Sequence, residues 1–195
     1  MAGNLALALG YGGTVSTQPR QTIAAVVLAA GQSRRFGGPK QLHPIGSRSM
    51  LELVLETLEQ TGIEQRLLVL GARAQLIAES VPLHGATVIR CSGWRDGQAA
   101  SLRCGLRSLP AAIEEALVVL GDGPGLSAEA VRRVAAGSGM RAADYGHGRS
   151  HPVVIPRALW RSLPASGETP ARSLAATLID CTGLPEPGDV DYAAP

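Results

Sequence analysis

IAAVVLAAGQSRRFGGPKQL, residues 23–42, carries the main sequence signal for the fold. Residues 23–30 are all apolar, which predicts a strand buried on both faces of a parallel sheet. The glycine-containing loop that follows carries Arg34, Arg35 and Lys40 within seven residues. Glycine lets the backbone approach a ligand closely, backbone N–H groups bind phosphate oxygens, and cations neutralise phosphate charge. The sequence therefore predicts a polyphosphate-binding loop directly after a central strand.

Strands and helices alternate along the rest of the chain. Apolar runs and capping residues predict strands at 66–70, 87–90, 116–120, 142–147, 152–156 and 178–181, and helices at 49–62, 72–80 and 97–109 and from Ser127, Arg157 and Thr169. Such alternation is typical of βαβ units, so we expect an α/β fold: a doubly wound, three-layer αβα sandwich with a mostly parallel sheet. Ligands bind beyond the carboxyl ends of the strands in such sheets. The loops after the first and fourth strands are therefore the candidate sites.

Composition limits the domain count and the class of partner. The 195 residues suit one domain, which we place at 23–195 after an N-terminal extension at 1–22. A net charge of +2 and 3% aromatic residues argue against a nucleic-acid surface. The longest apolar run is far shorter than the roughly 20 residues that span a bilayer, so we expect no membrane partner and a cytoplasmic protein. The 3 cysteines are far apart, which indicates neither a zinc site nor disulfides.

Spacing in the first loop excludes two common phosphate motifs. A P-loop requires Ser or Thr directly after its lysine, whereas Gln41 follows Lys40. A dinucleotide fingerprint is not satisfied between Gly31 and Gly37. Lys40 is also the single lysine among 18 basic residues, which indicates a position that needs a compact ammonium group.

The first loop resembles the signature of the MobA-like NTP transferases, the molybdenum cofactor guanylyl- and cytidylyltransferases. The family pattern is L-A-[AG]-G-x-[SG]-x-R-[MF]-G-x-x-K, and it is matched at Leu28, Ala29, Ala30, Gly31, Ser33, Arg35, Phe36, Gly37 and Lys40. The resemblance covers the chain from Ile23 onward and implies a Rossmann-like, GT-A-like nucleotidyltransferase fold. It further implies that Lys40 and Arg35 are catalytic and that the nucleotide is bound by Leu28, Ala29, Ala30, Gly31, Ser33, Arg34, Gly37, Lys40 and Ser101.

Other segments also resemble this family. Residues 97–106 are similar to its G-x-x-x-S-L-x-x-G-L helix, which contains Ser101. LGDGP, residues 120–124, stands in the place of a turn whose aspartate binds the metal, so the resemblance implies that Asp122 is a ligand of Mg²⁺. Carboxylate oxygens beside phosphates are the ligands that Mg²⁺ prefers. The segment at 189–191 resembles a D-[IV]-D element and makes Asp191 a second candidate metal ligand.

The resemblance also suggests an acceptor site, and this sequence departs from the family pattern in the turn that contains Asp122. GRSHP, residues 148–152, resembles the G-H-P stretch of the cytidylyltransferase branch, which implies that His151 contacts the acceptor. Gly123 replaces the Gln or Met that the family has beside its metal-binding aspartate, and Gly125 adds a further glycine. This departure indicates a subfamily with a different acceptor.

The implied activity is transfer of a nucleoside monophosphate from a nucleoside triphosphate to a small phosphorylated acceptor such as molybdopterin, with Mg²⁺ as cofactor and pyrophosphate as product. Ala30 gives LAAG, as in the cytidylyltransferase branch, which favours CTP over GTP. A phosphate acceptor is already ionised and needs no general base, which agrees with the absence of a Ser, His and Asp triad in the sequence. The oligomeric state is open.

Three alternatives remain. PKQ, residues 39–41, resembles methylerythritol phosphate cytidylyltransferase, although its D-A-A-R-P element is missing. An NAD(P)H-dependent oxidoreductase of the nicotine blue type, on a related scaffold, is kept open by the altered LGDGP turn. A nucleotide-binding regulatory module without turnover is the third alternative, because fold does not fix function.

Overall fold

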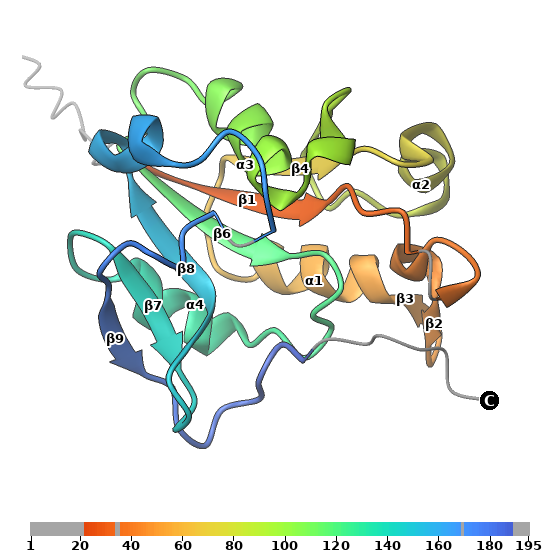
Figure 1. Ribbon diagram of the computed structural model, residues 1–195. Coiled ribbons are helices and arrows are strands. Elements are labelled where there is room, and N and C mark those ends of the chain that lie inside the picture. The colour runs from red at the N-terminus through yellow and green to blue at the C-terminus, as the bar shows by residue number, and fades with distance from the viewer. Residues whose placement is uncertain (1–21, 34–35, 169, 189–195) are drawn as a thin grey trace, which may run out of the picture.

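A seven-stranded sheet runs through the residues that the computed structural model describes, 22–33, 36–168 and 170–188 (Figure 1). All neighbouring strands are parallel except at β8, which is antiparallel to both of its neighbours. The mostly parallel α/β sheet predicted from the alternation is therefore confirmed. In spatial order the strands are β5 (Thr87–Arg90), β4 (Arg66–Leu70), β1 (Ile23–Ala29), β6 (Glu115–Leu120), β8 (Arg149–Pro156), β7 (Arg141–Asp144) and β9 (Thr177–Asp180).

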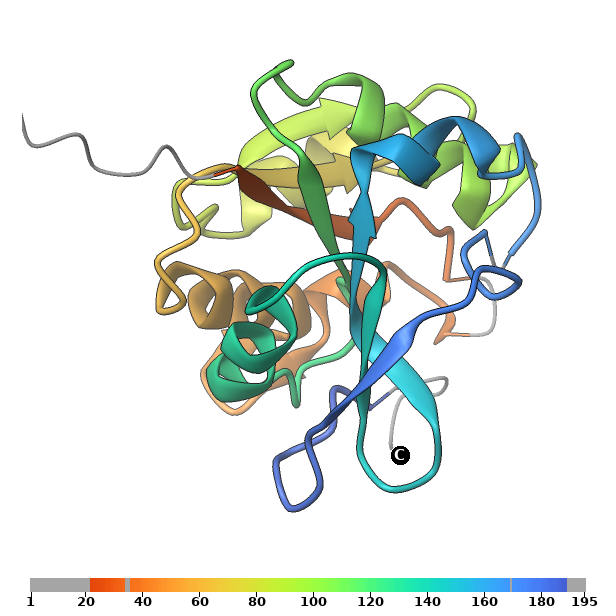
Figure 2. The same ribbon diagram turned by 90° about the vertical axis from the view of Figure 1, so that its left-hand side faces the viewer.

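Helices cover both faces of this sheet, as the perpendicular views in Figures 1 and 2 show. On one face lie α1 (Met50–Glu59) and α4 (Ala128–Ala135), and α2 (Ala74–Ser80) packs into the same core. On the other face lie α3 (Gln98–Arg107) and the 3₁₀ helix η4 (Arg157–Ser162). The result is the expected three-layer αβα sandwich.

Strand β1 separates the two cores of the molecule. Its alternate side chains point to opposite faces, and those from Ala24 to Ala29 are all at most 7% exposed. One set packs with α1 and α4: Ala25, Val27 and Ala29. The other set packs with α3 and η4: Ala24, Val26 and Leu28. An apolar run without alternation is what a strand covered on both faces requires.

Two helices begin at the capping residues that the sequence indicates. The Ser49 hydroxyl accepts the Glu52 N–H at 3.2 Å, and the Glu52 carboxylate accepts the Ser49 N–H at 3.2 Å, which makes a complete capping box for α1. The Ser127 hydroxyl accepts the Ala130 N–H at 3.4 Å at the start of α4. Both caps are local features, so they were predictable from spacing alone.

The structure corrects the sequence-based expectation at two places. Residues 170–173 form turns and not the predicted helix from Thr169, which itself lies outside the described residues. Carbonyl groups of this region accept tertiary hydrogen bonds, since Leu174 accepts from Arg149 at 2.7 Å and Gly167 accepts from Ala99 at 2.8 Å. The predicted loop before α1 contains a small hairpin of β2 (Pro44–Ile45) and β3 (Arg48–Ser49). No helix in the described ranges is long and apolar enough to cross a bilayer.

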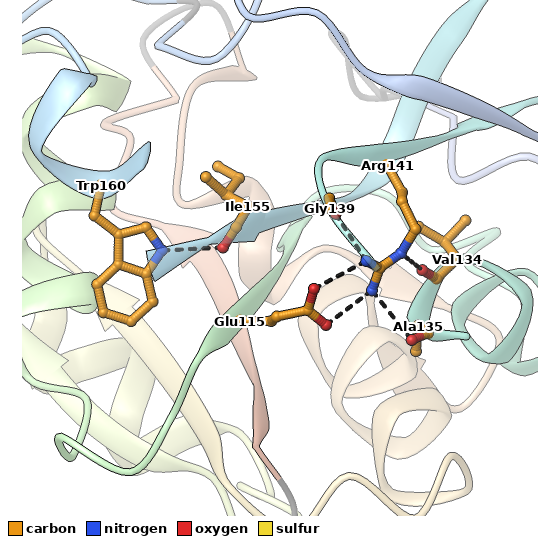
Figure 3. A network of polar contacts seen from close by, with 7 residues as sticks. All are labelled: Glu115, Val134, Ala135, Gly139, Arg141, Ile155 and Trp160. Atoms are coloured by element: carbon orange, nitrogen blue, oxygen red, sulfur yellow. Dashed lines mark hydrogen bonds and ion pairs between the residues drawn. The ribbon is translucent and has the colours of Figure 1, made fainter. Parts of the chain in front are cut away.

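A buried ion pair joins β6, β7 and α4 at the end of the sheet opposite to the carboxyl ends of β1 and β6 (Figure 3). Arg141 is 2% exposed, and its two amino groups donate to the two carboxylate oxygens of Glu115, each at 2.9 Å. The rest of the guanidinium group donates to three carbonyls, those of Val134, Ala135 and Gly139. The same figure shows the indole N–H of Trp160 donating to the Ile155 carbonyl at 3.0 Å, which fixes η4 to β8. These contacts hold the scaffold that positions the loops at the other end.

Candidate active site

A cleft of about 620 Å³ lies at the carboxyl ends of β1 and β6. Because these strands pair in parallel, the loops that follow them leave the sheet at the same edge. The other wall comes from the 3₁₀ helix η3 (Trp94–Asp96) and the start of α3. The cleft is lined by Leu28, Ala29, Ala30, Gly31, Gln32, Ser33, Phe36, Lys40, Gln41, Trp94, Arg95, Gly97, Gln98, Ser101, Leu120, Gly121, Asp122 and Glu168.

The structure brings together most of the residues predicted to bind a nucleotide. Seven of them line the cleft: Leu28, Ala29, Ala30, Gly31, Ser33, Lys40 and Ser101. Gly37 belongs to the same loop but does not line the cleft. Arg34, Arg35 and Asp191 lie outside the described residues, so their predicted roles stay predictions.

The loop after β1 curls back on itself. Ser33 has φ 53° and Gly37 has φ 77°, both in the left-handed region. The Ser33 side chain accepts the Lys40 N–H at 3.2 Å, and its carbonyl accepts the Phe36 N–H at 3.0 Å. A Cβ atom on Gly31 or Gly37 would meet no atom within 4 Å. The glycines therefore leave open space above the backbone, which a ligand can approach closely.

Lys40 and Asp122 meet across the cleft. The ammonium group of Lys40 is in direct contact with Oδ2 of Asp122, and the side chains are only 16% and 21% exposed. Lys40 comes from the loop after β1 and Asp122 from the turn after β6, so 82 residues of sequence separate two groups that share one site. A partly buried charge requires a partner of opposite sign. The Lys40 ammonium and the Asp122 carboxylate therefore neutralise each other.

The residues of this cleft fit a magnesium ion that is held jointly with phosphate. The described residues contain no cluster of three or more His, Cys, Asp or Glu side chains able to hold a metal ion. Mg²⁺ commonly uses one or two protein carboxylates and takes its other ligands from phosphates and water. Asp122, beside the phosphate-type loop, suits such an arrangement and does not make a preformed all-protein metal site.

Gln41 is a site residue to which sequence reasoning gave no role. It is 3% exposed, and its side-chain amide donates to the carbonyl of Ala29 at 2.9 Å and to that of Gly31 at 3.3 Å. Its amide oxygen is buried without a hydrogen-bond partner in the described part of the chain. Gln41 thus fastens the loop to the end of β1. The only feature of the sequence that points to Gln41 as a site residue is its position directly after Lys40 in PKQ, residues 39–41.

Ser101 on the opposite wall was expected from the sequence, whereas Trp94 and Arg95 on the same wall were given no role of their own. The guanidinium group of Arg95 lies 4.7 Å from the centre of the Trp94 ring. Trp94 packs against Gly71, where any Cβ would lie 2.8 Å from the Ala30 carbonyl oxygen. A segment distant in sequence closes this wall, because Gly167 accepts the Ala99 N–H at 2.8 Å. A lone tryptophan between strands carries no sequence signal for such a position.

The two glycines of the LGDGP turn have a structural explanation. A Cβ on Gly123 would lie 2.8 Å from Cβ of Pro187, and one on Gly125 would collide with the Glu186 carbonyl oxygen. The Gly125 N–H also donates to the Pro187 carbonyl at 3.0 Å. The glycines therefore allow the segment around Pro187 to cross directly over the turn that carries Asp122. This departure from the family pattern is a packing requirement.

A second cavity of about 530 Å³ adjoins the cleft and shares Leu28 and Gln98 with it. His151 lines this second cavity and not the cleft. Burial, aided by the neighbouring Arg149, lowers the pKa of His151 to about 4, so its imidazole is neutral at pH 7. The structure thus places His151 next to the cleft of Lys40 and Asp122 but in a space of its own.

Comparison with known proteins explains the arrangement. The MobA-like NTP transferase domain matches residues 25–181, which is most of the chain. The chain belongs to the MobA-like NTP transferase family. The match includes both loops that form the cleft, the loop after β1 and the turn after β6.

Relatives of this MobA-like chain have different activities. The nicotine blue oxidoreductase of Paenarthrobacter nicotinovorans is 30% identical over 188 residues, covering 87% of this chain and 92% of that protein. The molybdenum cofactor guanylyltransferase of Mesorhizobium japonicum is 33% identical over 149 residues, covering 72% and 68%. The bifunctional protein GlmU of Kineococcus radiotolerans is 32% identical, but the match covers only 26% of its length and 62% of this chain.

Solved structures confirm the fold of this MobA-like chain. Rv0371c from Mycobacterium tuberculosis H37Rv superposes with a TM-score of 0.76 at 28% identity, covering 88% of this chain and 94% of that one. A structure of Rv0371c in complex with manganese matches with a TM-score of 0.71 at 26% identity, covering 86% and 93%.

Proposed function

We propose that this chain transfers a nucleoside monophosphate from a nucleoside triphosphate to a small phosphorylated acceptor. The observation that carries the proposal is the contact between Lys40 and Asp122 across the cleft, between the glycine-containing loop and the turn after β6. Phosphoryl chemistry is catalysed mainly by positioning and by neutralisation of charge. One ammonium and one carboxylate group at this point supply the cation for phosphate oxygens and the ligand for a divalent metal ion.

The reaction is an in-line displacement. A phosphate oxygen of the acceptor forms a bond to the α-phosphorus, the bond from that phosphorus to the bridging oxygen breaks, and pyrophosphate leaves with the electron pair. Backbone N–H groups of the loop around Gly31 orient the triphosphate, and the Lys40 ammonium neutralises the charge that builds on the leaving group. Asp122 would hold Mg²⁺, which supplies positive charge beside the phosphates. Arg35 and Asp191 are proposed to assist these two groups, as the family pattern implies.

CTP is the proposed donor because Ala30 gives the LAAG sequence of the cytidylyltransferase branch. Ala30 lines the cleft, and its carbonyl is already engaged by the Ala72 N–H at 3.1 Å. The base would therefore contact other groups of the cleft, such as Ser101 on the opposite wall. Molybdopterin is the acceptor that the family resemblance favours. Because one relative is a guanylyltransferase, GTP is the alternative donor against which CTP should be compared.

Thermal unfolding with CTP, GTP, ATP, UTP and NADPH, each with and without Mg²⁺, tests the donor. A ligand at about 100 times its Kd raises the free energy of unfolding by about 2.7 kcal/mol. We expect the largest shift with CTP and only in the presence of Mg²⁺. Equal shifts for CTP and GTP would remove the donor preference, and no shift with any triphosphate would contradict nucleotidyl transfer.

A second candidate function is an NAD(P)H-dependent reductase. The observation in its favour is the 30% identity to nicotine blue oxidoreductase, which this chain matches over 92% of that protein. Stabilisation by NADPH alone, together with oxidation of NADPH by a quinone-like dye, would make the reductase the better assignment. Pyrophosphate release from CTP in the presence of an acceptor would exclude it as the main activity.

A further inference from the structure

The second cavity combines an apolar floor with a positively charged rim. Its floor is formed by Leu102, Val118, Val153 and Ile155. Two arginines, Arg149 and Arg172, line it, and no acidic side chain is among the described residues that do so. A volume of about 530 Å³ is within the range of small-molecule sites, which pair apolar walls with a few polar groups. The cavity therefore suits a small ligand that has an apolar body and a negative charge.

Arg149 is a half-buried cation that lines this cavity. Its Nη1 donates to the Leu174 carbonyl at 2.7 Å, whereas its Nη2 is buried and has no hydrogen-bond partner among the described residues. Burial lowers the pKa of Arg149, which shows that the charge is partly desolvated. A buried donor without a partner costs free energy, and an anion removes that cost.

Glu186, which contacts two of the residues that line the cavity, is already engaged. One carboxylate oxygen of Glu186 lies 2.9 Å from Nε2 of His147, and the other accepts the hydroxyl of Ser150 at 3.3 Å. In the described ranges no carboxylate forms an ion pair with Arg149. The neutral imidazole of His151 beside it adds a hydrogen-bonding group but no charge. Among the described residues, Arg149 therefore has no carboxylate counter-ion in the cavity.

We infer that Arg149 is the anion-recognition residue of the second cavity, where it binds a carboxylate or phosphate group of a small ligand whose apolar body lies on the floor. Arg172, which is exposed at the same cavity, adds long-range attraction. The guanidinium group provides the paired donors that a planar carboxylate or a phosphate accepts.

The inference rests on the proposed function where it concerns the identity of this ligand. The reacting phosphate of the acceptor must meet the nucleotide in the cleft, beside Lys40 and Asp122. Arg149 lines only the second cavity, which meets the cleft at Leu28 and Gln98. The acceptor therefore carries a second anionic group, separated by its apolar body from the phosphate that reacts.

Calorimetric titration with three probes tests the site: 2-naphthoate, 2-naphthyl phosphate and the neutral 2-naphthamide. We expect both anions to bind the wild-type protein and the amide to bind at least about tenfold more weakly. Arg149→Met should weaken both anions by about tenfold or more, because a charged hydrogen bond is lost. The matched control Arg161→Met removes an exposed arginine of η4 that does not line the cavity, and should change nothing. Comparison of the two anions shows whether carboxylate or phosphate fits better.

Lys40→Ala separates this inference from the proposed function. We expect Lys40→Ala to lose the response to CTP with Mg²⁺ and to keep anion binding, and Arg149→Met to show the reverse. Anion binding that is equally tight in Arg149→Met and in the wild-type protein would overturn the inference, as would wild-type protein that binds none of the probes or binds the amide equally well. Failure of the CTP response in the wild-type protein would overturn only the proposed function.

Discussion

Lys40 shows how much a single residue decides in this protein. It is the one lysine in a chain with 18 basic residues, and its ammonium group meets Asp122 in the cleft. A compact ammonium on a flexible stem can move from a carboxylate to a phosphate oxygen, whereas a planar guanidinium group demands a larger and more rigid partner. The role proposed for Lys40 therefore depends on the chemical difference between Lys and Arg.

Substitution of Lys40 is expected to remove transfer and to preserve the fold. Lys40→Ala should lower kcat by about 100-fold or more, as loss of one preorganised charge stabiliser does elsewhere. Lys40→Arg should restore little of this loss. Release of pyrophosphate from CTP measures the effect, and far-UV circular dichroism checks the fold. Full activity in Lys40→Ala, with Arg161→Ala as the control, would contradict the assignment.

Asp122→Asn should uncouple the nucleotide from the metal ion. The amide is a weaker ligand for Mg²⁺ than a carboxylate, so Mg²⁺ should no longer add to the thermal stabilisation that CTP gives. The measurement is the unfolding temperature over a titration of Mg²⁺ at fixed CTP. An unchanged Mg²⁺ titration in this variant would refute the proposed ligand role.

His151 should make stability depend on pH. Its pKa is about 4 in the folded protein against 6.5 in the unfolded chain, so the unfolded chain binds more protons between these values. The free energy of unfolding therefore falls as the pH decreases from about 6.5 to about 4. Urea unfolding of His151→Gln should show a shallower fall over this window.

His147 provides a control of opposite sign. A hydrogen bond and charge attraction from Glu186 raise its pKa, so its contribution to stability is present at low pH and is lost as pH rises through that value. His147→Gln should therefore steepen the fall toward low pH. A pH profile of His151→Gln that matches the wild-type profile would show that His151 is not desolvated.

At the scale of elements, α3 owes its position to one glycine. A Cβ on Gly105 would lie 2.8 Å from Cγ1 of Val26 and 2.9 Å from Cγ2 of Val69. The helix can therefore lie close to β1 and β4, and its first turn then forms a wall of the cleft. The close approach explains why a glycine, which disfavours helices, stands in the middle of α3.

Gly105→Ala should destabilise the protein through overpacking. The extra methyl group must displace two valine side chains, and the expected cost is about 1–3 kcal/mol in the free energy of unfolding. Gly93→Ala is the matched control, because the nearest atom to its Cβ is Asp96 Oδ2, at an ordinary 3.7 Å. Denaturant unfolding of both variants tests the difference. Equal stability of Gly105→Ala and the control would show that α3 can move outward without cost.

At the scale of the whole molecule, the ion pair of Arg141 and Glu115 ties together three consecutive elements, β6, α4 and β7. It joins the starts of β6 and β7 and the end of α4 (Figure 3). Five hydrogen bonds of 2.7–3.2 Å from one guanidinium group compensate for its burial. This network is remote from the cleft, so its role is to hold the second half of the sheet.

Arg141→Leu should cost about 3 kcal/mol in the free energy of unfolding, because it leaves the Glu115 carboxylate without compensation. Glu115 is 19% exposed, which places the expected cost at the low end for a buried pair. The double variant Arg141→Leu with Glu115→Leu should recover much of the loss. Urea unfolding of the single and the double variant measures both costs. A double variant that is less stable than Arg141→Leu would contradict the explanation by an uncompensated Glu115 carboxylate.

Much of the scaffold was predictable, since the strands, the main helices and the caps at Ser49 and Ser127 depend on residues close together in sequence. The glycine-containing loop was predictable for the same reason, because its glycines and Lys40 lie close together in sequence and their spacing is typical of phosphate binding. The predicted helix after Thr169 was wrong because tertiary contacts engage the backbone of that region. Gln41 and Trp94 were given no individual role because side-chain contacts position them, those of Gln41 with the Ala29 and Gly31 carbonyls and those of Trp94 with Gly71.

The α/β architecture and the loop after β1 follow from the sequence, because apolar periodicity, caps and glycine spacing act through neighbouring residues. Which side chains meet in the site follows from tertiary packing. It brought Lys40 to Asp122 and laid the segment around Pro187 over the glycines of the Asp122 turn. In the part of the chain that the structure describes, it gave Arg149 no counter-ion in the second cavity. Such contacts depend on the packing of the parallel strands and their connections, so no local pattern encodes them.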